Sequence, residues 1–205
     1  DSVFESWNDV VSISISDNHF VGLKSDGTVV AVGSNNSGQC NVNNWDNIIQ
    51  VAAGDGFTLG LKLDGTVIAT GRNSSGQCNV DDWTNIVSIS ASRQALGVKS
   101  DGTVVATGYN YDGQCDVDEW TDIVAVEGND GYPFTVGLKA DGTVDFKKSL
   151  MGVTNAVKEN EAEFKKYDGF IGVAADLIKT DYPKAVGFLL GKILVVDHLN
   201  HATAL

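Results

Sequence analysis

The three histidines, His19, His198 and His201, are the residues with the clearest capacity for metal chemistry. In Asp197-His198-x-x-His201 two imidazoles stand one helical turn apart, a spacing that could hold a metal ion. A zinc site needs a larger cluster of ligands, and this pair lies close to a chain end. We therefore interpret the pair as a solvated helix end and predict no metal site.

The patterns of common catalytic sites are missing from the sequence. It contains no Ser-His-Asp order, nucleophile elbow, phosphate-binding loop or His-Glu-x-x-His motif. The acid pairs Asp81-Asp82 and Asp118-Glu119 each precede a tryptophan, and we interpret them as solvated loop charges, not a general acid and base. We predict no enzymatic activity and no cofactor.

Three cysteines, Cys40, Cys78 and Cys115, each end a Gly-Gln-Cys triplet. Their shared position predicts a small, buried residue at the end of a third strand or in the loop after it. Equivalent atoms on neighbouring repeats lie too far apart for a disulfide, and no Cys-x-x-Cys pair is present. Unpaired cysteines favour a reducing compartment such as the cytoplasm, while secretion stays open. No signal peptide or membrane span is visible.

A recurring segment positions all of these residues except the last two histidines. Complete copies begin at Trp7, Trp45 and Trp83 and an incomplete one at Trp120, with spacings of 38, 38 and 37 residues by subtraction. A period of about 20–50 residues indicates a solenoid, a propeller or another repeat array. We therefore divide the chain into repeats over residues 1–144 and a tail over residues 145–205.

The copy from Trp45 shows what each repeat builds. Residues 48–53, 57–63 and 66–70 are apolar runs rich in strand-forming residues, and Asp64-Gly65 lies between the last two. Asp-Gly between apolar runs predicts a type I′ hairpin turn, with positive φ at both central residues. Each copy is thus a unit of three to four antiparallel strands that must stack on neighbours, because it cannot stand alone in water.

Two further patterns predict the packing of the strands. In the first copy Val11, Ile13 and Ile15 alternate with serines, so we expect their side of the strand to be buried. A glycine recurs before the second strand's Leu-Lys or Val-Lys, which predicts a close backbone approach there. These glycines are Gly22, Gly60, Gly97 and Gly137.

The repeated pattern W-x-x-I-V-x-V, then G-L-K-x-D-G-T-V-x-A-x-G-x-N-x-x-G-Q, resembles the short bacterial form of the regulator-of-chromosome-condensation repeat. It is also similar to the propeller-type β-lactamase inhibitor proteins. The resemblance covers residues 7–144 and implies a seven-bladed propeller that serves as a binding platform. Members of this group bind a small GTPase, chromatin or an enzyme, and fold alone does not choose among these.

The copies are too few for a seven-bladed ring. The fourth breaks after Asp141-Gly142-Thr143-Val144, so we predict a mostly β, partial propeller of about 3.5 blades. An unclosed array exposes a sheet edge and an apolar face at each end. Three completions stay open: two chains pair, the tail caps one end, or the chain is a piece of a longer protein.

The tail is predicted to be α-helical. Residues 153–167 are rich in Ala, Lys and Glu, and residues 170–178 have the spacing of an amphipathic helix. Residues 185–196 are almost wholly apolar, but 12 residues are too few to span a bilayer, which makes membrane insertion a minor alternative. The residues predicted to form a cap or homodimer interface are Phe170, Ile171, Leu177, Ile178, Phe188, Leu189 and Ile193.

The formal net charge of −13 lies entirely on the repeats. Residues 1–144 carry 6 Lys and Arg against 19 Asp and Glu, whereas residues 145–205 carry 8 of each kind. Nucleic-acid binding depends on neutralising phosphates, so this balance argues against DNA or RNA. A protein partner with a basic surface patch is the expected electrostatic complement.

The loops before the second strand and after the third differ from copy to copy, which predicts a partner-binding rim. Aromatic and arginine residues are the usual anchors of such interfaces. An alternative for Phe20, Phe57 and Phe134 is that they are buried as core. The predicted partner-binding residues are His19, Phe20, Phe57, Arg72, Arg93, Gln94, Tyr109, Tyr111, Tyr132 and Phe134.

The sequence therefore favours a non-enzymatic protein–protein interaction module, completed by dimerisation or by its tail. A toxin or membrane-active effector, with the repeats as scaffold and the tail as active segment, is the alternative. A guanine-nucleotide exchange factor is a second alternative, which the family resemblance alone implies.

Overall fold

The computed structural model describes residue 4 and residues 7–129 and 134–147. These residues form four three-stranded antiparallel sheets, one from each copy of the repeat. Sheet 1 contains β1 (Val10–Ile15), β2 (His19–Lys24) and β3 (Val29–Gly33), and sheet 2 contains β4 (Ile48–Ala53), β5 (Phe57–Lys62) and β6 (Val67–Gly71). Sheet 3 contains β7 (Ile86–Ala91), β8 (Gln94–Lys99) and β9 (Val104–Gly108), and sheet 4 contains β10 (Ile123–Gly128), β11 (Thr135–Lys139) and β12 (Val144–Lys147).

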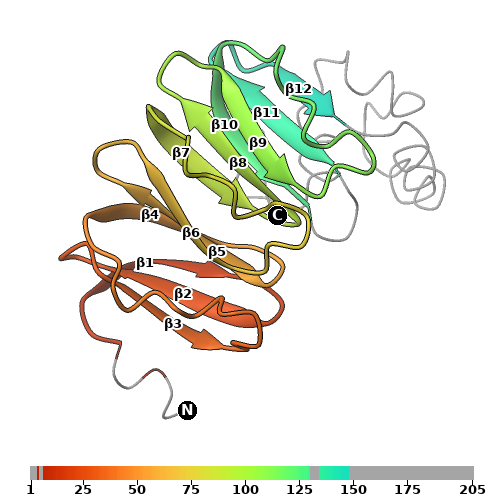
Figure 1. The fold of residues 1–205 in the computed structure, drawn as a ribbon. Helices are drawn as coiled ribbons and strands as arrows, with labels where there is room; N and C mark the ends of the chain where they lie inside the picture. Colours follow the sequence, from red (N-terminus) through yellow and green to blue (C-terminus); the bar gives the residue numbers. More distant parts are fainter. Residues whose placement is uncertain (1–3, 5–6, 130–133, 148–205) are drawn as a thin grey trace, which may run out of the picture.

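The four sheets stack in sequence order along an arc, from β1–β3 at one end to β10–β12 at the other (Figure 1). The first strands of consecutive sheets contact one another. The mostly β, partial propeller is therefore confirmed, with three strands in every described sheet and none with four. The predicted helical tail lies outside the described residues, as do its interface residues from Phe170 to Ile193.

The Asp-Gly hairpin turns differ from the prediction. Only the glycine has positive φ, 81° at Gly27, and the aspartate before it does not. The Gly27 N–H donates to Lys24 O at 3.0 Å, which is a type I turn followed by a left-handed glycine. Asp26 stabilises the turn, because its Oδ1 accepts from the Thr28 hydroxyl at 2.6 Å and the Thr28 N–H at 2.9 Å. These bonds hold the pKa of the exposed Asp26 carboxyl below its usual value.

The recurring glycine of the second strand lies directly beneath the tryptophan of its own copy. A Cβ atom at Gly60 would be 2.7 Å from the Trp45 indole, so only glycine fits without a shift. A close contact is present at this glycine, but the predicted backbone approach is wrong, because the approaching group is an indole ring. The same pairing joins Gly22 to Trp7, Gly97 to Trp83 and Gly137 to Trp120.

Apolar clusters fill the junctions between neighbouring sheets. At the first junction the second and third strands of sheet 1 contribute Val21, Leu23 and Val29. They pack against Trp45, Ile48 and Val51 of sheet 2. The Ile48 N–H also donates to Gly27 O in the preceding sheet at 3.0 Å. The other two junctions repeat both features, so the array is held by nearest-neighbour contacts.

The prediction that Val11, Ile13 and Ile15 are buried is wrong. They are 65%, 63% and 51% exposed. Val11 lies at the β-bulge of β1, and Ile13 and Ile15 point away from sheet 2. The residues equivalent to Ile13 in the next sheets, Val51 and Ile89, are only 6% and 3% exposed because a preceding sheet covers them.

Candidate partner-binding face

The loops that differ between copies meet at one end of each sheet. The loop between the first two strands is hydrogen-bonded to the loop after the third, as in Arg72 N–H to Gly56 O at 2.8 Å. Neighbouring sheets are also joined there, because the Asp55 N–H donates to Ser92 O at 2.7 Å. We name this surface the loop face; it comprises residues 16–18, 34–38, 54–56, 72–76, 92–93 and 109–113.

Side-chain amides hold the loops after the third strands in a fixed shape. In sheet 2 the Asn73 amide donates to Asn79 Oδ1 at 2.9 Å and accepts from the Cys78 N–H at 2.8 Å. The buried Gln77 accepts from the Ser75 N–H at 2.8 Å. The other two copies make the same bonds through Asn35, Gln39, Asn110 and Gln114. The variable side chains are therefore carried by a repeated, rigid frame.

The cysteines belong to this frame. The Cys78 thiol donates to Arg72 O at 3.2 Å, and all three cysteines are half-buried and unpaired. Burial raises the pKa of Cys78 to about 11. Burial, with the charge of Asp116 as a lesser cause, raises the pKa of Cys115 to about 12. The thiols are therefore neutral at physiological pH and are not activated nucleophiles.

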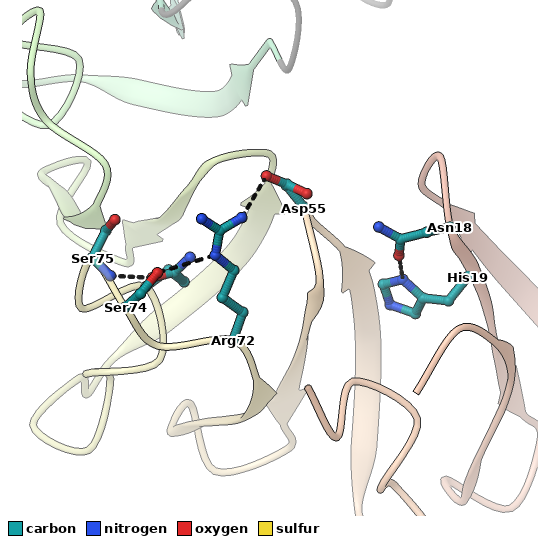
Figure 2. A network of polar contacts seen from close by, with 7 residues as sticks. Asn18, His19, Asp55, Arg72, Ser74 and Ser75 are labelled. Atoms are coloured by element: carbon teal, nitrogen blue, oxygen red, sulfur yellow. Dashed lines mark hydrogen bonds and ion pairs between the residues drawn. The ribbon is translucent and has the colours of Figure 1, made fainter. Parts of the chain in front are cut away.

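Four of the residues predicted to bind a partner lie together on the loop face. Arg72 forms an ion pair with Asp55 at 3.2 Å and donates to Ser74 Oγ at 3.0 Å (Figure 2). Arg93 lies 5.9 Å from the centre of the Tyr109 ring, and Tyr111 is 87% exposed. Aromatic and arginine side chains on a pre-ordered frame are the usual anchors of protein interfaces.

Four other predicted residues are buried. His19, Phe57 and Gln94 are each the first residue of a second strand and have no exposed surface. Each points into the junction with the next sheet, so none of them can touch a partner at the loop face. Phe134 is also buried and packs on Phe146, with ring centres 5.5 Å apart.

The last two predicted residues lie elsewhere. Phe20 is 38% exposed on the outward face of sheet 1, where it contacts Phe4. Tyr132 is outside the described residues. Sequence reasoning thus grouped residues from three different environments.

His19 joins sheet 1 to sheet 2 through a chain of hydrogen bonds. The Thr58 hydroxyl donates to Gln39 O at 2.7 Å, so it accepts from His19 Nε2–H at 2.8 Å. In this tautomer Nδ1 accepts from the Ser16 hydroxyl at 2.8 Å. The Asn18 side-chain amide also lies 3.0 Å from Nδ1 (Figure 2), and it can bond to this nitrogen only when its NH2 group, not its oxygen, faces the ring. Burial lowers the pKa of His19, which favours the neutral ring.

His19 is expected to make the stability of the folded protein depend on pH. Because its pKa is lowered in the folded protein, the unfolded chain binds the proton more readily, and stability should fall as the pH drops below about 6.5. His19→Gln should reduce this loss, because Gln94 makes the equivalent bond to Thr135 Oγ1 at 2.9 Å without titrating. Urea unfolding at pH 7.5 and 5.5 would test it. Equal pH sensitivity of the two proteins would contradict it.

Among the described residues no group of three or more His, Cys, Asp or Glu side chains is placed to hold a metal ion. The predicted pair His198 and His201 lies outside them. In the same part of the chain, no helix has the length and apolar character needed to cross a membrane.

Comparison with known proteins identifies the repeated unit. Residues 10–39 and 48–77 match the family model described as the regulator of chromosome condensation (RCC1) repeat. The first two copies are therefore similar to RCC1 repeats. The matched stretches cover the three strands of sheet 1 and of sheet 2, from the bulged first strand to the Gly-Gln of the loop face.

Solved structures share the stacked arrangement of the three-stranded sheets. Human WBSCR16 superposes with a TM-score of 0.57 at 18% identity, over 68% of this chain and 47% of that one. Prp20p from Saccharomyces cerevisiae, described with its binding properties to Gsp1p and histones, has a TM-score of 0.55 at 16% identity, over 67% and 44%. At these identities the likeness concerns the fold alone.

A curated relative matches over a shorter stretch. A chromosome partition protein Smc of Mesomycoplasma hyorhinis is 41% identical over 73 residues, which are 29% of this chain and 8% of that protein. The chain thus spans less than half of the two solved structures and a small part of this relative.

Proposed function

We propose that the chain is a non-enzymatic interaction module that binds a protein partner through its loop face. The observation that carries this proposal is the contrast between a fixed frame and variable side chains. The same Asn and Gln bonds recur in three copies, whereas the residues they present change, for example Ser34, Arg72 and Tyr109 at one position.

The chemistry of the loop face supports a protein partner. Tyr111 offers an exposed aromatic side chain, and the Arg72–Asp55 pair, 49% and 44% exposed, offers both charges at the rim. The formal charge of the repeats is strongly negative, which favours a partner with a basic patch and disfavours nucleic acid. The propeller-like relative Prp20p was described with protein ligands, Gsp1p and histones, which agrees with this class of function.

Two substitutions, one on the loop face and one at the opposite end of a sheet, are expected to affect partner affinity differently. Tyr111→Ala should weaken partner binding by about tenfold or more, as expected for an anchor residue. Leu63→Ala should leave affinity unchanged, because Leu63 is 72% exposed beside the Asp64-Gly65 hairpin turn, at the opposite end of the sheet. The partner would be identified by cross-linking to the full chain, and its Kd measured by titration.

The results would distinguish whether the chain binds a protein partner from where on the chain the partner binds. Loss of affinity in Leu63→Ala with none in Tyr111→Ala would place the interface at the hairpin end and contradict the loop face. Absence of any saturable protein ligand for the unaltered chain would contradict the interaction module itself.

A further inference from the structure

The outward face of sheet 1 is an exposed apolar surface. The strand register forms two cross-strand rows there, Ile13–Gly22–Val30 and Ile15–Phe20–Val32. Phe4, 47% exposed, adds to the surface through edge contacts with Trp7 and Phe20, with ring centres 5.0 and 5.5 Å apart. No charged residue lies in either row. We name these residues the end face.

The end face is not a copy of the faces that join the other sheets. The row that reads Ile15–Phe20–Val32 in sheet 1 reads Ala53–Thr58–Thr70 in sheet 2. In sheet 3 it reads Ala91–Ala95–Thr107. All three side chains of this row are thus larger or less polar in sheet 1 than in the sheets that have a preceding neighbour.

The replaced hydroxyls have a defined role in the junctions. Thr58 and Thr70 donate to the main-chain carbonyls of Gln39 and Gly38 in the preceding copy, at 2.7 and 3.0 Å. Phe20 and Val32 cannot make these bonds. The end face therefore lacks both of these side-chain hydrogen bonds, of which sheet 3 keeps the one from Thr107 to Gly76 O, and it is suited to an apolar occupant.

We propose that residues 185–196 of the same chain dock on the end face. This segment, Ala185-Val-Gly-Phe-Leu-Leu-Gly-Lys-Ile-Leu-Val-Val196, has one charged residue in twelve. It contains Phe188, Leu189 and Ile193, three of the residues predicted to form a cap or homodimer interface. Its apolar character matches the rows of the end face, and burial of both surfaces provides the driving force.

The length of the intervening chain agrees with this occupant. Packed sheets lie about 10 Å apart, so three junctions and one further layer place the occupant within about 40 Å of sheet 4. Residues 148–184, 37 by subtraction, separate β12 from the segment. A coil of that length has a root-mean-square span of about 30–37 Å. Because the span of this linker matches the separation, the effective concentration of residues 185–196 at the end face is near its maximum.

A second copy of the chain is a less suitable occupant. Suppose that sheet 4 of the second copy packed on the end face as a neighbouring blade. Phe134 of that copy would then lie opposite Phe20, and two phenylalanine rings would need the space that the observed junctions give to the smaller Thr58, Ala95 or Thr135. The formal charge of −13 also makes two copies repel each other. Docking within one chain avoids both difficulties.

Disulfide trapping in the full chain tests the docking. Ile13→Cys is combined with Leu190→Cys after replacement of Cys40, Cys78 and Cys115 by serine. The matched control pairs Leu190→Cys with Val87→Cys, because Val87 is 55% exposed on sheet 3 and Ile13 is 63% exposed. Docking predicts a bond within one chain between positions 13 and 190 that forms about tenfold faster than in the control.

Three results would overturn the proposal: equal rates in the two pairs, no bond at position 13, or bonds joining position 13 of two copies. A second measurement avoids altering the end face. In the full chain, Phe188→Ser with Leu190→Ser should accelerate hydrogen exchange of the β1 amides about tenfold. Unchanged exchange in a folded variant would also reject docking.

Discussion

Trp83→Ala is expected to lower the free energy of unfolding by about 3–5 kcal/mol. The indole is only 8% exposed and lies over Gly97. It also belongs to the cluster that joins sheet 2 to sheet 3, with Leu59 and Ile86. Its removal therefore opens a cavity within one sheet and at the junction beside it. Urea unfolding, followed by far-ultraviolet circular dichroism, would measure the loss.

The first tryptophan of the array is the matched control. Trp7 occupies the same place over Gly22, but it is half-buried and sheet 1 has no described neighbour on that side. Trp7→Ala should therefore cost clearly less than Trp83→Ala. Equal losses would show that the tryptophan acts only within its own sheet and that the junction contacts add nothing.

Gly71→Ala is expected to cost about 3 kcal/mol or more, through strain and a steric clash together. Gly71 ends β6 with φ of 117°, and an added Cβ would be 2.5 Å from Gly56 O. That oxygen accepts the Arg72 N–H, so the substitution also displaces a residue of the loop face. Thermal unfolding measures the first effect, and partner affinity the second.

Gly76→Ala separates the two causes. Gly76 also has positive φ, 85°, but the nearest atoms to its added Cβ would belong to side chains and not to the main chain, with the Asn79 amide at 3.1 Å. It should cost about 1–2 kcal/mol, the penalty of a left-handed residue alone. If both variants lose the same amount, the clash with Gly56 O is relieved and the larger prediction fails.

Much of the blade was predictable from one copy of the repeat. The apolar runs at 48–53, 57–63 and 66–70 correspond to β4, β5 and β6 within one residue at each end. The recurring glycine predicted a close contact because glycine costs stability in a strand unless space requires it. The turn type was not predictable from Asp-Gly alone, since a type I turn with a glycine bulge uses the same dipeptide.

The candidate site was less predictable, because a residue can vary between copies either at an exposed loop or at a buried junction between sheets. His19, Phe57 and Gln94 vary between copies, as exposed loop residues do, yet they are buried. The two-residue period of the strand would have predicted this burial, because His19 lies on the same side of β2 as the buried Val21 and Leu23. Conversely, Ile13 has the pattern of a buried residue and is exposed, because burial there depends on a neighbouring sheet.

The buried first residues of β2, β5 and β8 have a consequence for how the array can change in length. His19 faces Thr58, Phe57 shares a cluster with Ala95, and Gln94 faces Thr135, so polar and apolar junctions alternate. Loss of the second copy alone would set His19 against Ala95 and leave its Nε2–H without an acceptor. Loss of the second and third copies together would set His19 against Thr135, a compatible pair. Internal repeats should therefore be lost more readily in pairs than singly, because removal of the second and third copies together keeps a polar residue opposite His19.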